Sequence, residues 1–153
     1  MSNLTISQGR ILPMSEMAIN NVRQLQEIEL KKPQVDIETW HILHGGMYAR
    51  TIMIPANTRL TGALIKIATV LIASGDFTVY INDEVIEKKG YHVFAASSGR
   101  KQAFIARTDT YLTMIFATNA KTVSEAEEQF TDESALLSSR LPHSVNNITI
   151  TGE

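Results

Sequence analysis

Apolar residues between positions 39 and 116 come in short runs, rich in β-branched and aromatic side chains, separated by turn-forming residues. Several runs alternate apolar and polar positions, which is typical of strands with one buried face. The predicted strands are 39–44, 48–54, 60–67, 70–73, 77–81, 85–88, 91–95, 102–106 and 111–116. The predicted turns include 74–76 and 82–84, which contain Gly75 and Asn82. Strands at a regular spacing of about ten residues favour a sandwich or barrel over alternating βαβ units.

A different pattern precedes the strands. Ala18, Val22, Leu25 and Ile28 recur at steps of three and four, which predicts a helix over residues 15–32. Its apolar stripe is thin. We therefore expect the helix to lie on a surface, either of its own barrel or of a neighbouring subunit.

A second helical segment follows the strands. Thr122 and Glu125 have the spacing of a capping box, which predicts a helix to about Phe130. A short helical turn is expected over 132–138. The polar, β-prone tail, residues 144–153, is either frayed or added as a strand to a partner's sheet edge.

The 153 residues fit one domain with extensions at both ends. We divide them into an N-terminal arm and helix (1–37), a barrel (38–118) and a C-terminal helix and extended tail (119–153). A net charge of −2 gives no reason to expect nucleic acid as a partner, and the absence of cysteine excludes disulfides and thiolate metal sites. No apolar run approaches the ~20 residues that span a bilayer, and the N-terminus lacks a secretory pattern. We expect a protein that is neither secreted nor bound to a membrane.

Three turn motifs resemble those of a known superfamily. They are the Ile54–Thr58 turn that leads to Gly62, the Ser74-Gly75 turn before a Thr-Val-Tyr run, and the Ser98–Lys101 turn. Over residues 45–118 the chain resembles the cupin superfamily, and in particular small cupin-like proteins encoded by tailed bacteriophages and prophages. The resemblance implies a mainly β, double-stranded β-helix (jelly-roll) barrel with a pocket in its mouth. It also implies a dimer or a higher homo-oligomer.

Metal-binding cupins hold their ion with two histidines, a carboxylate and a further histidine. Placed by resemblance on this chain, those four slots fall at Ile65, Ile67, Thr69 and Gln102. Transition metals need imidazole, carboxylate or thiolate ligands, and none of these residues supplies one. We therefore predict no metal and no cofactor, with a barrel interior that is largely apolar and packed.

Histidines give weak catalytic candidates. His41 and His44 are three apart in a predicted strand, so they point to opposite faces and do not share a metal. Metal-free epimerases of cupin shape use a histidine base, a carboxylate and a tyrosine acid. His92, Asp109 and Tyr111 are the only set that can be nominated for those roles, although ordinary structural hydrogen bonds explain these residues better.

Three cations lie close together in sequence: Arg100, Lys101 and Arg107. They could bind a phosphate or carboxylate, but such a group of cations more often forms a solvated sheet edge that resists aggregation.

Three functions remain open. The first is a non-enzymatic phage or prophage protein that acts through protein contacts, as an oligomeric structural component of the virion or an accessory component. It would reside in the host cytoplasm or the virion and would contact its own copies and other phage or host proteins. The second is a binder of an anionic or nucleotide-like small molecule. The third is a metal-independent isomerase or epimerase.

Overall fold

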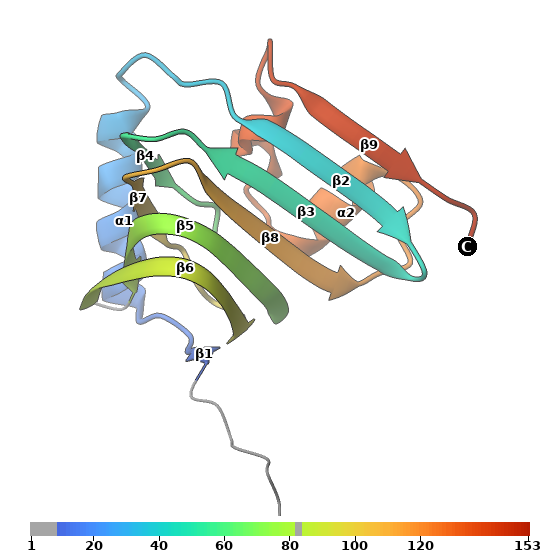
Figure 1. Cartoon of the computed structure of the whole chain (residues 1–153), viewed down its shortest axis with the longest axis horizontal. Coiled ribbons are helices and arrows are strands. Elements are labelled where there is room, and N and C mark those ends of the chain that lie inside the picture. The colour runs from blue at the N-terminus through green and yellow to red at the C-terminus, as the bar shows by residue number, and fades with distance from the viewer. Residues whose placement is uncertain (1–8, 82–83) are drawn as a thin grey trace, which may run out of the picture.

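A computed structural model describes residues 9–81 and 84–153 of the protein (Figure 1). Strands, most of them paired in antiparallel, are its main regular structure. The strands are β1 (Arg10–Ile11), β2 (Glu38–His44), β3 (Met47–Ile54), β4 (Thr58–Thr61), β5 (Thr69–Ile81), β6 (Glu84–Ala96), β7 (Ala103–Ala106), β8 (Thr110–Ala117) and β9 (Asn146–Ile150). The helices are α1 (Glu16–Glu29), α2 (Val123–Phe130) and the 3-10 turns η1 (Ser134–Leu136) and η2 (Ser138–Arg140). The predicted mainly β fold is confirmed. Residues 1–8 of the predicted arm and 82–83 of the predicted turn at 82–84 lie outside the described residues.

The strand pairings form two layers joined by the long strands β5 and β6. In the large sheet, β3 pairs with β8, β8 with the first half of β5, and that half with the second half of β6. In the small sheet, β4 pairs with β7, β7 with the second half of β5, and that half with the first half of β6. Two antiparallel sheets interleaved in this way form a jelly roll, the predicted architecture. The large sheet continues through β2 to β9 on one side and to β1 on the other.

Two paired glycines let β5 and β6 pass from one sheet to the other. Gly75 and Gly90 are partners in the β5–β6 ladder and have φ angles of +151° and +93°. A Cβ on Gly75 would lie 2.5 Å from Thr110 Oγ1. The sequence predicted a tight turn at 74–76 and separate strands over 85–88 and 91–95. Both predictions were wrong, because β5 and β6 each continue through their glycine. The glycines bend one continuous hairpin because only glycine tolerates these backbone angles and this close approach.

The predicted strand over 60–67 is also shorter than expected. β4 ends at Thr61, and Gly62 N–H then donates to the carbonyl of Gln102. Ile65 keeps one bridge to Arg100. Ala63, Ile65 and Ile67 pack instead against a hydrophobic cluster that contains Phe116 and Phe130. These tertiary contacts override the strand propensity of the segment.

The N-terminal helix lies on its own barrel. Ser15 caps it by accepting a hydrogen bond from Ala18 N. Ala18 and Val22 are fully buried in a cluster with Ala103 of β7, whereas Ile28 near the end of the helix is exposed. Figure 1 shows α1 beside β4 and β7. The structure therefore decides between the two surfaces left open by the sequence.

The C-terminal segment returns to the large sheet. α2 begins at the predicted capping box, where Thr122 Oγ1 accepts from Glu125 N. Its Phe130 packs with Phe116 on the inner side of the sheet. β9 then pairs in parallel with β2 of the same chain, so it is neither frayed nor given to a partner's sheet.

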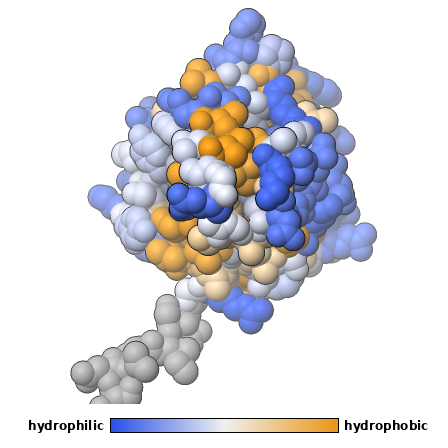
Figure 2. Space-filling view, turned by 90° about the vertical axis from the view of Figure 1, so that its right-hand side faces the viewer, coloured by the Kyte–Doolittle hydropathy of each residue, from blue (hydrophilic) through white to orange (hydrophobic). Residues whose placement is uncertain are grey.

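Inward side chains of both sheets form the core, in which Phe77 and Phe104 meet with ring centroids 6.2 Å apart. Hydrophobic side chains also reach the surface. Figure 2 views the side that lies to the right in Figure 1 and shows hydrophobic patches between hydrophilic ones. On β9, Ile148 and Ile150 are exposed. The molecule thus leaves some apolar surface uncovered.

Candidate functional site

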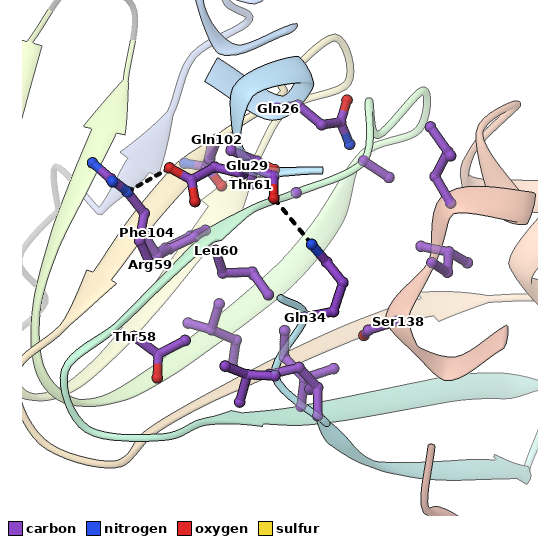
Figure 3. A pocket seen from close by; sticks show the side chains of 18 of the residues that line it. Gln26, Glu29, Gln34, Thr58, Arg59, Leu60, Thr61, Gln102, Phe104 and Ser138 are labelled. Atoms are coloured by element: carbon purple, nitrogen blue, oxygen red, sulfur yellow. Dashed lines mark hydrogen bonds and ion pairs between the residues drawn. The ribbon is translucent and has the colours of Figure 1, made fainter. Parts of the chain in front are cut away.

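A cavity of about 480 Å³ opens from the inside of the barrel (Figure 3). Its walls come from β3, β4, β8, the end of α1 with the loop that follows, and the C-terminal 3-10 turns. Small-molecule pockets usually measure ~300–1,000 Å³, so the cavity is large enough for an organic ligand. The sequence predicted a packed interior, and this was wrong.

The inner wall is apolar because of strand alternation. Ile52 on β3, Leu112 and Met114 on β8, and Leu71 on β5 all line the cavity. They occupy the inward positions of their strands, and successive strand residues point to opposite faces. Leu60 on β4 completes this wall, and Figure 3 shows its side chain among the cavity residues. The interior was therefore correctly predicted to be largely apolar.

One polar side chain on this wall lacks a partner. Gln102 lines the cavity with only 6 % of its surface exposed. Its amide nitrogen Nε2 is buried and has no hydrogen-bond partner among residues 9–81 and 84–153. A buried amide without a partner costs roughly 1–3 kcal/mol, so a group that accepts from Nε2 would be stabilised there.

The mouth of the cavity is polar. Glu29 Oε1 at the end of α1 lies 2.9 Å from Arg59 Nε on β4. Gln34 donates from Nε2 to the carbonyls of Glu29 and Lys32, both at 3.0 Å. Figure 3 shows the ion pair and the Gln34 bond to Glu29 as dashed lines. These contacts fasten the loop after α1 to the rim.

A buried ion pair forms another part of the wall. Arg50 on β3 donates to Glu127 Oε2 at 2.7 Å and to Ser139 Oγ at 3.0 Å. Arg140 donates from Nε to the other carboxylate oxygen at 2.9 Å. Burial by itself raises the pKa of Glu127, but hydrogen bonds from Ser139 and Arg140 and the charge of Arg50 leave that pKa below its usual value. The pair joins the barrel to the C-terminal segment.

His41 lies next to this network. Its Nδ1 is 2.7 Å from Tyr48 Oη, and its Nε2 is 2.7 Å from Asn146 Oδ1 on β9. Burial lowers the pKa of His41 and raises the pKa of Tyr48. With the neutral ring protonated on Nε2, His41 donates to Asn146 and accepts from Tyr48. His44 is exposed, so the two histidines lie on opposite faces as predicted.

Only two of the four predicted metal slots, Ile65 and Gln102, line the cavity. Ile65 and Ile67 both pack against the hydrophobic cluster that contains Phe116 and Phe130. Thr69 Oγ1 accepts from Arg100 Nη2 at 2.7 Å. Within the described part of the chain, no group of three or more His, Cys, Asp or Glu side chains could hold a metal ion. The absence of a cofactor stays a prediction.

The three predicted anion ligands do not converge. Lys101 is fully buried, and its Nζ lies 2.9 Å from Glu133 Oε1. Arg107, on the outside, pairs with Asp76 and donates to Thr78 Oγ1. Of the three cations, only Arg100 lines the cavity.

Arg100 is buried, and its guanidinium bonds to uncharged oxygen atoms. Its guanidinium donates to Thr69 Oγ1 and to the carbonyls of Ile67, Ala96 and Ser97. Burial lowers its pKa to about 10, so it is still charged at neutral pH. No ion pair to Arg100 occurs among the residues that the structure places. Arg100 therefore brings to the cavity wall a positive charge that no carboxylate of residues 9–81 and 84–153 pairs with.

The nominated catalytic set lies outside the cavity. His92 Nε2 is 2.9 Å from the carbonyl of Lys89, and Asp109 accepts from Ala56 N at 2.9 Å. Tyr111 packs near Trp40 on the outer face, with ring centroids 6.2 Å apart. None of the three lines the cavity.

Sequence reasoning missed Arg50, Glu127 and Glu29. Arg50 had a signal, because it occupies an inward position of an alternating run, where a charge requires a partner. Glu127 gave no such signal, since it lies 77 residues from Arg50 along the chain.

No protein-family model and no curated protein matches the sequence. Solved structures with similar folds include a cupin superfamily protein from Desulfitobacterium hafniense (9 % identity, TM-score 0.45, covering 57 % of this chain and 83 % of that one). A conserved protein of unknown function from Streptococcus pyogenes has 10 % identity and a TM-score of 0.43, covering 57 % of this chain and 79 % of that one. Salicylate 1,2-dioxygenase from Pseudoaminobacter salicylatoxidans has 14 % identity and a TM-score of 0.46, covering 75 % of this chain and 37 % of that one.

The chain thus spans little more than a third of the dioxygenase. At these TM-scores the likenesses carry no functional weight, and the jelly-roll assignment rests on the strand pairings. Across residues 9–81 and 84–153, no helix is long and apolar enough to cross a lipid bilayer.

Proposed function

We propose that the protein binds a small, mainly apolar molecule with an anionic or strongly hydrogen-bond-accepting group in the barrel cavity. The observation that carries this proposal is the 480 Å³ cavity with its largely apolar wall, to which Gln102 adds a buried amide nitrogen that has no hydrogen-bond partner among residues 9–81 and 84–153. The proposal develops the second function left open by the sequence, binding of an anionic small molecule. It keeps Arg100 as an anchor and replaces Lys101 and Arg107, which do not line the cavity.

The lining fits such a ligand. Leu71, Leu112 and Met114 offer apolar contact, while Gln102 supplies a donor and Arg100 a net positive charge. Few, well-placed polar groups on an apolar wall are the usual composition of a ligand pocket. A ligand with an apolar tail and a carboxylate would accept a hydrogen bond from the amide nitrogen of Gln102. Its negative charge would also lower the electrostatic cost of burying the Arg100 guanidinium.

Binding is favoured over catalysis by the identity of the lining. Among the described residues that line the cavity there is no histidine, tyrosine or cysteine, and Glu29 is the only carboxylate. Glu29 is paired with Arg59. His92, Asp109 and Tyr111, nominated for an isomerase, are not among the residues that line the cavity.

Calorimetric titration with octanoate, methyl octanoate and octanol tests the proposal. We expect octanoate to bind most tightly, because it alone carries a negative charge towards Arg100. Leu60→Trp fills the cavity and should raise the Kd of octanoate at least tenfold. Arg107→Ala, outside the cavity, is the matched control and should leave that Kd unchanged. Failure of all three probes to bind, or equal binding to Leu60→Trp, would refute the proposal.

The phage or prophage origin, and the role as a structural or accessory component acting through protein contacts, stay predictions. One observation favours protein contacts independently of the cavity: the outer face of the large sheet is apolar.

A further inference from the structure

One edge of the small sheet is unpaired where it borders the cavity. Within the described residues, β4 pairs with β7 and with no other strand. Directly after β4, Gly62 N donates to the carbonyl of Gln102 at 2.8 Å. In an antiparallel pair the main-chain groups that bond to the partner belong to every second residue. The N–H and C=O groups of Arg59 and Thr61 therefore point away from β7, towards the free edge of β4.

The other side of β7 shows the same alternation. Directly after β7, Arg107 N donates to the carbonyl of Asp76 at 2.8 Å, so the odd-numbered residues of β7 bond to β5. The even-numbered ones bond to β4, and Phe104 among them is opposite Leu60. Apart from the ladder with β7, no main-chain hydrogen bond from the edge of β4 to another described segment occurs.

The cavity runs along this edge. All residues over 57–63 line it, and Figure 3 labels four of them. By contrast, β8 contributes only alternate residues, Leu112 and Met114, because the cavity meets one face of that strand. A cavity that contacts successive residues of a strand lies beside the backbone of that strand. We call this part of the cavity, beside 57–63, the edge groove.

The far side of the edge groove is apolar and open to solvent. It is formed by the loop after α1 and by the C-terminal 3-10 turns. Leu30 and Val35 of the loop line the cavity and are 53 % and 49 % exposed. Leu136 and Leu141 of the C-terminal segment also line it and are 49 % and 36 % exposed. Exposed apolar side chains gathered around a groove mark an interaction site.

The charge of the lining favours a negatively charged ligand end. Lys32, Arg50, Arg59 and Arg100 line the cavity, whereas Glu29 is the only carboxylate among the described lining residues. A carboxylate is attracted by this excess of positive charge, and an ammonium group is repelled.

The candidate anchors lie beyond one end of β4. Gln102 is opposite Gly62, which directly follows β4, and Arg100 forms a bridge with Ile65 further along. A chain that follows β4 in the same direction therefore ends near both anchors.

We infer that the ligand is a short extended peptide that ends in an apolar residue with a free carboxylate. Its main chain pairs in parallel with the free edge of β4, as extended peptides do when they add to a sheet edge. Its last side chain enters the apolar cavity, and its carboxylate faces Gln102 and Arg100. This inference rests on the proposed function, for which it names the class of ligand.

The edge groove accounts for the choice of a peptide. A simple fatty acid offers no row of N–H and C=O groups and leaves those of Arg59 and Thr61 unused. A pentapeptide at ~3.3 Å per residue is ~17 Å long, which is shorter than the ~23 Å spanned by 57–63. Main-chain pairing then supplies affinity, and the cavity selects the last side chain.

Calorimetric titration of the full chain with five acetylated pentapeptides tests the inference. The peptides are Ala-Thr-Ala-Thr followed by Leu, Ile, Val, Met or Phe. The tightest should have a Kd at least tenfold lower than the acetylated form of its last amino acid alone, which keeps the side chain and the carboxylate but has no strand. Converting the carboxylate of that peptide to an amide should raise its Kd at least tenfold, because the negative charge is lost.

Methylation of single peptide nitrogens tests the pairing with β4. Only every second residue of an extended peptide faces the strand it pairs with. Methylation should therefore raise the Kd at least tenfold at alternate positions and leave it nearly unchanged at the positions between, which are the matched controls. From the protein side, Thr61→Pro removes one N–H from the free edge and none from the ladder with β7. It should raise the Kd of the peptide at least tenfold, and if it fails to fold, the methylation series on wild type decides.

The outcomes separate this inference from the proposed function. Octanoate binding, together with no pentapeptide that binds more tightly than its matched acetyl amino acid, would overturn the inference alone. Methylation effects without alternation, or an unchanged peptide Kd in folded Thr61→Pro, would do the same. Failure of octanoate, methyl octanoate and octanol to bind refutes the proposed function itself.

Discussion

Arg50 and Glu127 form an ion pair with Nη1 and Oε2 only 2.7 Å apart, and both side chains are almost completely buried. Arg50 belongs to β3, and Glu127 belongs to α2. Arg50 also lies over the ring of Phe130, with its guanidinium carbon 5.5 Å from the ring centroid. One charged contact therefore fixes the C-terminal helix to the wall of the barrel cavity.

Removing one member of this pair should strongly destabilise the protein. Arg50→Met leaves a buried carboxylate whose remaining partners are Arg140 and Ser139, so we expect a loss of about 3–5 kcal/mol in the free energy of unfolding. Lys66→Met is the control, since its pair with Asp132 is exposed and should contribute about 0–1 kcal/mol. Urea denaturation measures both. Equal losses in the two variants would contradict a special role for the buried pair.

Acid should weaken the fold through the same carboxylate. The pKa of Glu127 in the folded state lies below its ordinary value of 4.5, because hydrogen bonds from Ser139 and Arg140 and the charge of Arg50 outweigh burial. Its stabilisation is complete above pH 4.5 and is lost as pH falls through the lower folded-state pKa. Glu127→Gln should reduce the slope of unfolding free energy against pH in this range. Some slope should remain, since the pKa of Glu133 is also lowered.

His41 should add a second pH-dependent contribution at higher pH. Burial lowers its pKa below 6.5, so the folded state favours the neutral ring between Tyr48 and Asn146. Stability is then complete above pH 6.5 and falls as the pH drops towards the folded-state pKa. His41→Gln should remove this decrease. Thermal unfolding between pH 7.5 and 5.5 measures it, and an identical pH profile in the variant would exclude His41 as its source.

Gly75→Ala should cost more than Gly90→Ala. Both positions have positive φ, so each substitution carries backbone strain of about 1–2 kcal/mol. Only the Cβ at position 75 also meets a neighbour, 3.0 Å from Thr110 Cα, whereas nothing lies within 4 Å at position 90. The difference in unfolding free energy between the two variants isolates this clash. It should be at least about 1 kcal/mol.

Gln102→Leu should separate stability from binding. The substitution removes a buried donor that has no partner in the described part of the chain, so the free protein should be unchanged or slightly more stable. The Kd of octanoate should nevertheless rise about tenfold, which corresponds to one hydrogen bond of ~1.4 kcal/mol. Calorimetric titration and thermal unfolding of the same preparation provide both values. A destabilised variant with unchanged affinity would assign Gln102 a purely structural role.

Local patterns predicted much of the fold. The caps at Ser15 and Thr122 and the opposite exposure of His41 and His44 all follow from short-range geometry. Strand alternation depends only on successive residues pointing to opposite faces. The mainly β class could therefore be read from the chain.

The sequence by itself determined most strand and helix positions, because caps and alternation act over a few residues. Only the tertiary structure decided that the barrel is hollow, that Gly75 bends a strand, and that β9 returns to β2. It also decided the partners of Arg50 and Lys101, which are 77 and 32 residues away along the chain. Cavities and buried charge pairs depend on side chains from distant segments, and neither spacing nor composition encodes which of them meet.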